Sequence, residues 1–167
     1  MSYQNSRVIL AIDPGNEYSG YVVLIVHEDK SIYVVDKGKV QNTHIFHVMD
    51  KYMKNSCEIA IEMIASYGMA VGKEVFETCV WIGKFIRHAE IVGITPTRIY
   101  RLQEKMCLCH STKAKDSNIV QALVDRFAPC QPNMGKGTKK NPGFFFGFKK
   151  DIWQAMAVAV TYLELEG

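Results

Sequence analysis

The chain has 167 residues, of which 48% are apolar, so it can bury a hydrophobic core without disulfide or metal staples and is too apolar to be disordered. Its net charge is only +3, no apolar run is long enough to span a bilayer, and the N-terminus lacks the layout of a secretion signal. We therefore expect one domain, residues 1–167, in a soluble cytoplasmic protein. The cysteine count is odd and lacks the paired spacing of a zinc site, which predicts reduced, packed thiols.

The first predicted element is a buried strand that ends on a carboxylate. Residues 8–12 are apolar and rich in β-branched side chains, and Pro14-Gly15 bounds the run directly after Asp13. A carboxylate at the end of a buried strand is costly unless a cation or hydrogen bonds compensate its charge, which favours Asp13 as a metal ligand. On this segment alone, an Asp that caps the turn is an equally good interpretation.

Two further strands are expected next. Residues 21–26 fold back on the first strand through a turn that carries Ser19-Gly20, and residues 31–40 add a third strand, which completes an antiparallel meander. Asn42-Thr43 can then cap a helix that continues to about residue 54.

The second half of the chain alternates between strands and helices. Residues 101–114 have no clear pattern, although 105–109 favour a helix. The order of elements predicts an α/β fold in which helices flank a five-stranded mixed sheet. The remaining predicted elements are strands at 58–64 and 97–100 and helices at 69–88, 115–127 and 151–165.

Basic residues gather late in the chain. Residues 97–150 hold 11 Lys and Arg against 3 Asp and Glu, and residues 130–150 combine five Lys with four Phe, four Gly and two Pro. A loop of that length in a compact domain is usually functional or mobile. The local positive charge suits a polyanion such as DNA or RNA, and a solubilising face is the alternative.

Three acidic side chains are expected to meet at one edge of the sheet. Asp13 ends the first strand, Glu62 ends a strand that would pair beside it, and Asp151 opens the last helix. Hard cations such as Mg²⁺ and Mn²⁺ prefer oxygen ligands, and two such ions held together suit in-line attack on a phosphodiester. Taken singly, Asp151 also suits a helix N-terminus and Glu62 suits an ion pair, but their joint placement favours a metal site.

With these residues in place, the chain resembles the RuvC family of Holliday junction resolvases, most closely its small phage-type members. The resemblance implies an RNase H-like fold, a homodimer, and paired nicking of branched double-stranded DNA at four-way junctions with Mg²⁺ or Mn²⁺. The segments that carry it are residues 11–15, 60–62 and 151–161, and the phage-type signature extends through 66–78 and 136–143.

The resemblance also assigns roles by position. Asp13, Glu62 and Asp151 match three of the family's four metal-site acids. The fourth position, three residues after Asp151, holds Gln154, which offers a neutral oxygen but no charge.

One lysine matches the family and another does not. Lys105 falls at an active-site lysine, which would orient water or stabilise the departing oxygen. The family's second lysine falls at Asp116, with Lys113 and Lys115 close by. This chain thus has a neutral residue where the family has an acid, and an acid where the family has a lysine. We therefore hypothesise that Asp116 partly replaces the acid lost at Gln154.

Several side chains are candidates for DNA contacts. Tyr67 follows the Glu62 strand and could stack on bases at the branch point, whereas Phe144–Phe146 either stack there too or cover the core or the dimer interface. The amphipathic segment 69–88 is the expected dimer contact. The candidate phosphate-binding lysines are Lys113, Lys115, Lys136, Lys139, Lys140, Lys149 and Lys150.

Other functions stay open at this point. A nuclease of the same fold could act on flaps, forks or RNA-containing duplexes, and Gln154 leaves room for a DNA-binding protein whose metal site has decayed. The loop at Asp13 also resembles the phosphate loop of actin-like ATPases, but 167 residues cannot supply their two large lobes.

Overall fold

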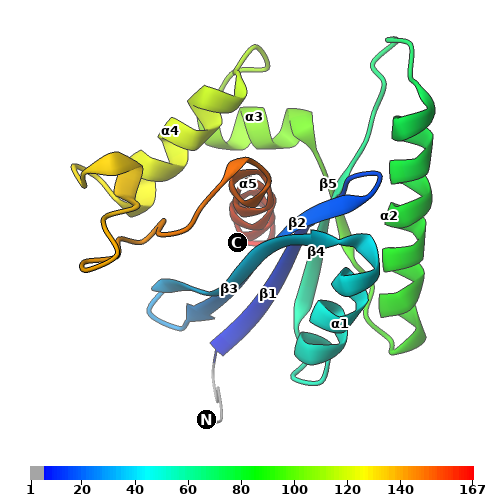
Figure 1. Ribbon diagram of the computed structural model, residues 1–167, viewed down its shortest axis with the longest axis horizontal. Helices are drawn as coiled ribbons and strands as arrows, with labels where there is room; N and C mark the ends of the chain where they lie inside the picture. Colours follow the sequence, from blue (N-terminus) through cyan, green and yellow to red (C-terminus); the bar gives the residue numbers. More distant parts are fainter. Residues whose placement is uncertain (1–5) are drawn as a thin grey trace.

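A five-stranded mixed sheet forms the centre of the computed structural model, which describes residues 6–167 (Figure 1). The first three strands form an antiparallel meander, and the other two lie parallel to the first strand, on its far side from the second. The order across the sheet is β3-β2-β1-β4-β5. The expected α/β fold with five strands is therefore confirmed. The strands are β1 (Ser6–Asp13), β2 (Tyr18–His27), β3 (Ile32–Gln41), β4 (Glu58–Met63) and β5 (Thr97–Tyr100).

Helices cover both faces of this sheet. The pair α1 and α2 packs on one face, and α5 lies on the other with α3 and α4 outside it (Figure 1). In the described residues, none of the helices is both long and apolar enough to cross a bilayer. The helices are α1 (Asn42–Met53), α2 (Lys73–Ile91), α3 (Arg101–Cys109), α4 (Asp116–Phe127) and α5 (Lys150–Glu166), and a single 3₁₀ turn, η1, spans Asn133–Gly135.

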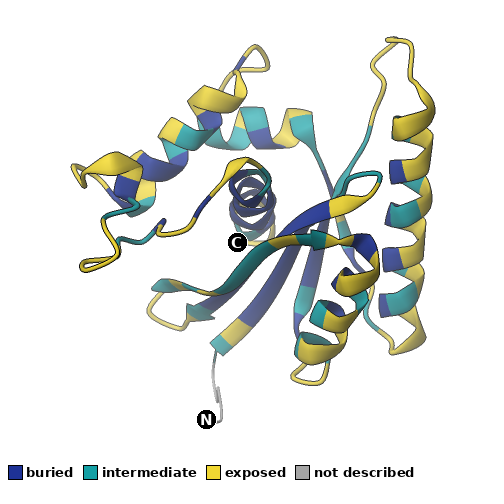
Figure 2. Ribbon diagram, in the orientation of Figure 1, coloured by how far each residue is buried: buried dark blue, intermediate teal, exposed yellow. Residues whose placement is uncertain are grey.

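The central strand contributes to two cores. Leu10 and Ile12 face α1 and α2, whereas Ile9 and Ala11 face α5, because successive side chains of a strand point to opposite faces. A strand that is covered on both sides is apolar at every position, which explains the unbroken apolar run in the sequence. Figure 2 shows the resulting buried centre, formed by the inner strands and α5.

The turn after β1 differs from the expectation. Ser19 and Gly20 lie inside β2, and the turn occupies residues 14–17. Asn42 is not a helix cap: its buried side chain accepts a hydrogen bond from Ser19 Oγ at 2.6 Å and donates one to the Gly15 carbonyl at 2.8 Å. The start of α1 thereby fixes the loop that follows Asp13.

Two helices begin at unexpected positions. α2 starts at Lys73 rather than residue 69, because residues 69–72 are exposed and have no packing surface that would hold them in a helix. α3 starts at Arg101, directly after β5, in a segment whose only fully buried residue is an acid, Glu104.

Aromatic side chains fix the long loop between α4 and α5. Phe145 and Phe148 are fully buried and contact Trp153 at the start of α5, and Phe144 stacks on Phe127 with ring centroids 5.1 Å apart. The phenylalanine cluster therefore mainly covers the core. Phe146 is the exception, with 41% of its surface exposed.

Candidate active site

Two acids lie side by side at the carboxyl ends of parallel strands. The β1–β4 register pairs Ile12 with Ile61, which places the following residues, Asp13 and Glu62, next to each other. The effect of Glu62 on the pKa of Asp13 agrees with this placement. The convergence of these two strand-end acids thus follows from the parallel pairing.

The third acid approaches them because a glycine leaves room. Gly20 on β2 pairs with Asp13, and an added Cβ at this glycine would lie 2.4 Å from the carbonyl oxygen of Asp151. Any larger residue would push the first turn of α5 away from the sheet. Gly20 therefore allows Asp151 to sit beside the strand ends.

The electrostatics of this end of the sheet are unfavourable without a cation. The pKa of Asp13 is raised well above its ordinary value, first by burial, then by the neighbouring carboxyl group of Glu62, and further by the charges of Asp151 and Glu104. A bound cation reverses this effect by stabilising the ionised carboxylates.

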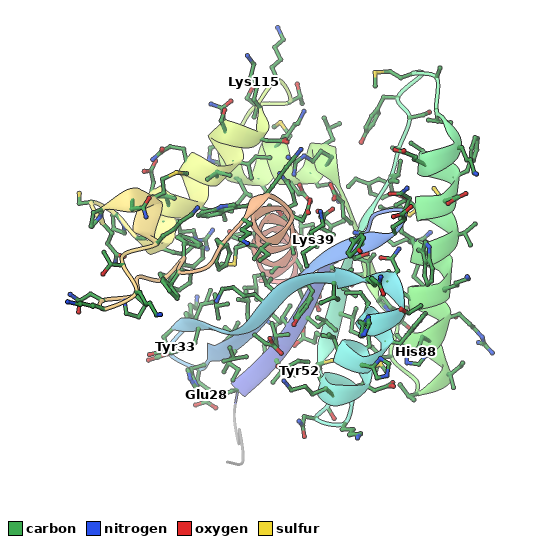
Figure 3. All side chains as sticks on the ribbon, in the orientation of Figure 1. Glu28, Tyr33, Lys39, Tyr52, His88 and Lys115 are labelled. Atoms are coloured by element: carbon green, nitrogen blue, oxygen red, sulfur yellow. The ribbon has the colours of Figure 1, made fainter. Side chains whose placement is uncertain are left out.

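A basic side chain pairs with the outermost acid. Lys39 on β3 forms an ion pair with Asp151, with 2.6 Å between Nζ and Oδ2, and Figure 3 labels this lysine near the start of α5. Both residues line a hollow of about 420 Å³ together with Asp13, residues 14–18 and Glu74. The site is thus open to solvent beside Asp13.

Arg101 forms the centre of a second polar cluster. Its guanidinium lies 2.5 Å from Glu104 Oε2 and also donates hydrogen bonds to Gln154 Oε1 and Asp116 Oδ1. The two residues that depart from the family pattern, Gln154 and Asp116, therefore share one arginine.

Glu104 is the acid that the sequence did not indicate. It is 0% exposed, and its Oε1 has no hydrogen-bond partner. Burial and the charge of Glu62 raise its pKa to about 8, against the opposing effect of Arg101. Its charge also acts on Asp13, so it belongs electrostatically to the acidic group at the strand ends.

Comparison with known proteins identifies the fold. No protein-family model and no curated protein matches the sequence. The structure matches that of Thermus thermophilus RuvC, with 17% sequence identity and a TM-score of 0.69 over 95% of this chain and 96% of that one. The chain has the RuvC fold. The expected RNase H-like architecture is therefore confirmed.

Two further structures agree with this fold. T. thermophilus RuvC in complex with a Holliday junction substrate matches at 14% identity and a TM-score of 0.66, again over 95% and 96% of the two chains. The yeast mitochondrial Holliday junction resolvase Ydc2 matches at 13% identity and a TM-score of 0.57 over 95% of this chain and 78% of that one.

Within the RuvC fold, the other predicted site residues lie on the helices α3 and α4 and in the loop between β4 and α2. Lys105 lies half-buried on α3, next to Glu104 in the chain. Asp116 is the first residue of α4, is 61% exposed at its side chain, and contacts Arg101 rather than the strand-end acids. Tyr67 lies in the loop between β4 and α2 and is 62% exposed.

The candidate phosphate-binding lysines lie apart from α1 and α2. Lys113 and Lys115 occupy the turn between α3 and α4, where Figure 3 shows Lys115 pointing away from the sheet. The others follow α4 in the long loop or open α5, and all but the half-buried Lys136 are exposed: Lys136, Lys139, Lys140, Lys149 and Lys150.

In this structure the acidic side chains are not arranged as a complete set of metal ligands. Within residues 6–167, no three His, Cys, Asp or Glu side chains are arranged as a metal-binding group. Asp151 instead pairs with Lys39, and Glu104 pairs with Arg101. Lys39 and Arg101 therefore each balance the charge of one of these acids.

Three residues of this site were missed from the sequence: Lys39, Arg101 and Glu104. A signal was present for two of them, because Arg101 and Glu104 are an oppositely charged pair three residues apart, directly after a strand that lies beside β4. Lys39 is an ordinary strand lysine, and only the fold brings it to Asp151.

Proposed function

We propose that this protein is a metal-dependent endonuclease that resolves four-way DNA junctions. The observation that carries the proposal is the convergence of Asp13, Glu62 and Asp151 at one end of a RuvC fold. The proposed setting is the cytoplasm, on host or phage DNA.

The donor set fits a hard divalent cation. Asp13, Glu62 and Asp151 offer carboxylate oxygens, which Mg²⁺ and Mn²⁺ prefer, and burial together with the neighbouring acids raises the pKa of Asp13, so a cation would favour its ionised form. These three residues would hold the metal. When bound, such an ion supplies an activated water and stabilises charge on the departing oxygen of a phosphodiester.

The remaining roles belong to this chain's own side chains. Lys105 stabilises negative charge on the reacting phosphate from α3, and Lys39 stays beside Asp151 at the rim of the hollow. Tyr67 stacks on bases at the branch point, since its ring is exposed in the loop that follows the Glu62 strand. The lysines after Cys109 bind the DNA backbone.

A homodimer would present two such sites to one junction. The outward face of α2 supports it, because this helix exposes Phe76, Val80 and Ile91 to solvent. Figure 2 shows the outer side of the α2 ribbon mostly in the yellow of exposed residues. A shallow hollow of about 470 Å³ beside Val80 and Ile91 is lined mainly by apolar surface of α2 and by Phe46 of α1. Exposed apolar surface of this kind is typical of a protein interface.

The test is cleavage of a synthetic four-way junction and a matched linear duplex in Mg²⁺ or Mn²⁺. We expect paired nicks in the junction and none in the duplex. Asp13→Asn should reduce cleavage more than ~100-fold and leave junction binding intact, because it removes a metal ligand and leaves the basic surface unchanged.

Asp29→Asn is the matched control for this variant, since Asp29 lies in the exposed turn between β2 and β3. It should cleave like the wild type. Absence of metal-dependent junction cleavage by the pure wild-type protein would refute the proposal, and preferred cleavage of flaps or forks would redirect it to another branched substrate.

A further inference from the structure

The family position for the fourth acid cannot supply a charge in this chain. Gln154 is neutral, and its side-chain oxygen already accepts a hydrogen bond from Arg101. Asp116, the alternative suggested by the sequence, binds the same guanidinium from the exposed start of α4. Arg101 therefore holds both residues.

Glu104 lies on the inner side of that arginine. The β4–β5 register pairs Glu62 with Ile99, so α3, which begins at Arg101, starts at the same end of the sheet as the strand-end acids. Glu104 is fully buried there, its charge acts on Asp13, and the charge of Glu62 acts on Glu104.

One oxygen of Glu104 has no partner. Only Glu104 Oε1 and Thr161 Oγ1 are buried side-chain polar atoms without a hydrogen bond in residues 6–167. A buried carboxylate oxygen is costly unless a donor or a cation satisfies it or a proton neutralises the group. Arg101 binds the other oxygen, Oε2, and Oε1 is left without a partner.

We propose that Glu104 supplies the fourth acidic group of the metal site, in the role that Gln154 cannot fill, and that Arg101 holds Glu104 in place. The inference rests on the proposed function, because it assigns a further ligand to that same site. Asp116 is then an outer partner of Arg101 and does not contact the metal.

The experiment measures Mn²⁺ binding directly, by calorimetry and by the Mn²⁺-induced rise in Tm, so it does not depend on cleavage. Glu104→Gln should weaken Mn²⁺ binding at least ~10-fold and shrink the rise in Tm. Glu164→Gln is the matched control, because Glu164 also pairs with an arginine, Arg126, but between α4 and α5. It should bind Mn²⁺ like the wild type.

A second pair of variants separates a ligand from a structural residue. Glu104→Asp should bind Mn²⁺ more tightly than Glu104→Gln, because it keeps the charge. Adding Gln154→Asp to Glu104→Gln should restore part of the lost affinity by returning an acid to the family position. Failure of both rescues, with far-UV circular dichroism unchanged, would overturn the inference.

Other outcomes are equally decisive. If the wild type binds Mn²⁺ and cleaves junctions while Glu104→Gln binds as tightly, the inference fails and the proposed function stands. If Asp116→Asn weakens Mn²⁺ binding more than Glu104→Gln does, Asp116 is the compensating acid. A wild type that neither binds Mn²⁺ nor cleaves would overturn the proposed function as well.

Discussion

Acidic residues at the two ends of β4 have opposite surroundings. Glu58, at its start, accepts two hydrogen bonds from the Arg7 guanidinium at 2.6 and 2.7 Å and one from the Tyr162 hydroxyl at 2.6 Å. These hydrogen bonds from Arg7, partly opposed by burial, lower the pKa of Glu58. At the other end, Glu62 repels its acidic neighbours. The first acid therefore stabilises the fold, whereas the second is electrostatically costly, as expected of a residue placed for the proposed metal site rather than for stability.

The lowered pKa of Glu58 predicts a pH-dependent contribution to stability. A carboxyl group whose folded-state pKa lies below its unfolded value stabilises the fold above that unfolded value, near 4.3, and loses this effect as the pH falls through the folded pKa. Glu58→Gln should therefore lower the free energy of unfolding at pH 7 by about 1 kcal/mol, a modest value because Arg7 is partly exposed to solvent.

Urea unfolding at pH 7, 5 and 3 measures this difference. The difference in the free energy of unfolding between the wild type and Glu58→Gln should be largest at pH 7 and should approach zero toward pH 3. Glu28→Gln, at an exposed position near the end of β2, is the control and should change little at any pH. A difference that grows as the pH falls would contradict a stabilising role of the ionised Glu58 carboxylate.

At the level of elements, the loop between α4 and α5 behaves as part of the core. Phe145 contacts Phe144, Phe148 and Trp153, and it packs against Gly135, whose φ of +73° only glycine adopts without strain. Because Trp153 belongs to the first turn of α5, this packing also positions Asp151. The loop thus supports the site mechanically while carrying lysines on its outer surface.

Substitution of two neighbouring phenylalanines, one buried and one exposed, tests whether the loop packs on the core. Phe145→Ala should lower the free energy of unfolding by about 3–5 kcal/mol, because it leaves a cavity in the core, whereas Phe146→Ala should cost less than about 1 kcal/mol. Chemical denaturation measures both. Equal effects would show that the loop does not pack on α5 as described.

The elements also show what the sequence can and cannot predict. The positions of Asp13 and Asp151 were predictable because each borders an apolar segment whose burial dictates its place. Arg101 and Glu104 were not, because α3 is short and the residue that it buries fully is an acid rather than an apolar side chain. Contacts such as Lys39–Asp151 depend on tertiary packing alone.

For the whole molecule, the candidate phosphate-binding lysines and the exposed apolar side chains of α2 lie in different places. The candidate phosphate-binding lysines accompany α3, α4 and the start of α5, whereas exposed apolar side chains of α2 lie on the other side of the sheet (Figure 1). The acidic strand ends lie between them. This separation would let the proposed dimer contact and the proposed DNA contact form together.

A charge on the face of α2 should therefore prevent dimer formation. Val80→Glu places a carboxylate at a position that is 57% exposed in the monomer and buried in the proposed dimer, which should weaken association at least ~30-fold. Light scattering coupled to size exclusion measures the mass. Val35→Glu, at an exposed apolar position on β3, is the control and should leave the mass unchanged. A monomeric wild type would refute the proposed dimer.

Gly20 limits how this protein can vary. It has no side chain that could bind a metal, donate a proton or contact DNA, yet the space it leaves open brings α5 against β2. A methyl group there would separate Asp151 from Asp13 without touching either carboxylate. Substitution at this position is therefore expected to be as poorly tolerated as substitution of the acids themselves, and a search for functional residues guided by reactive side chains alone would overlook it.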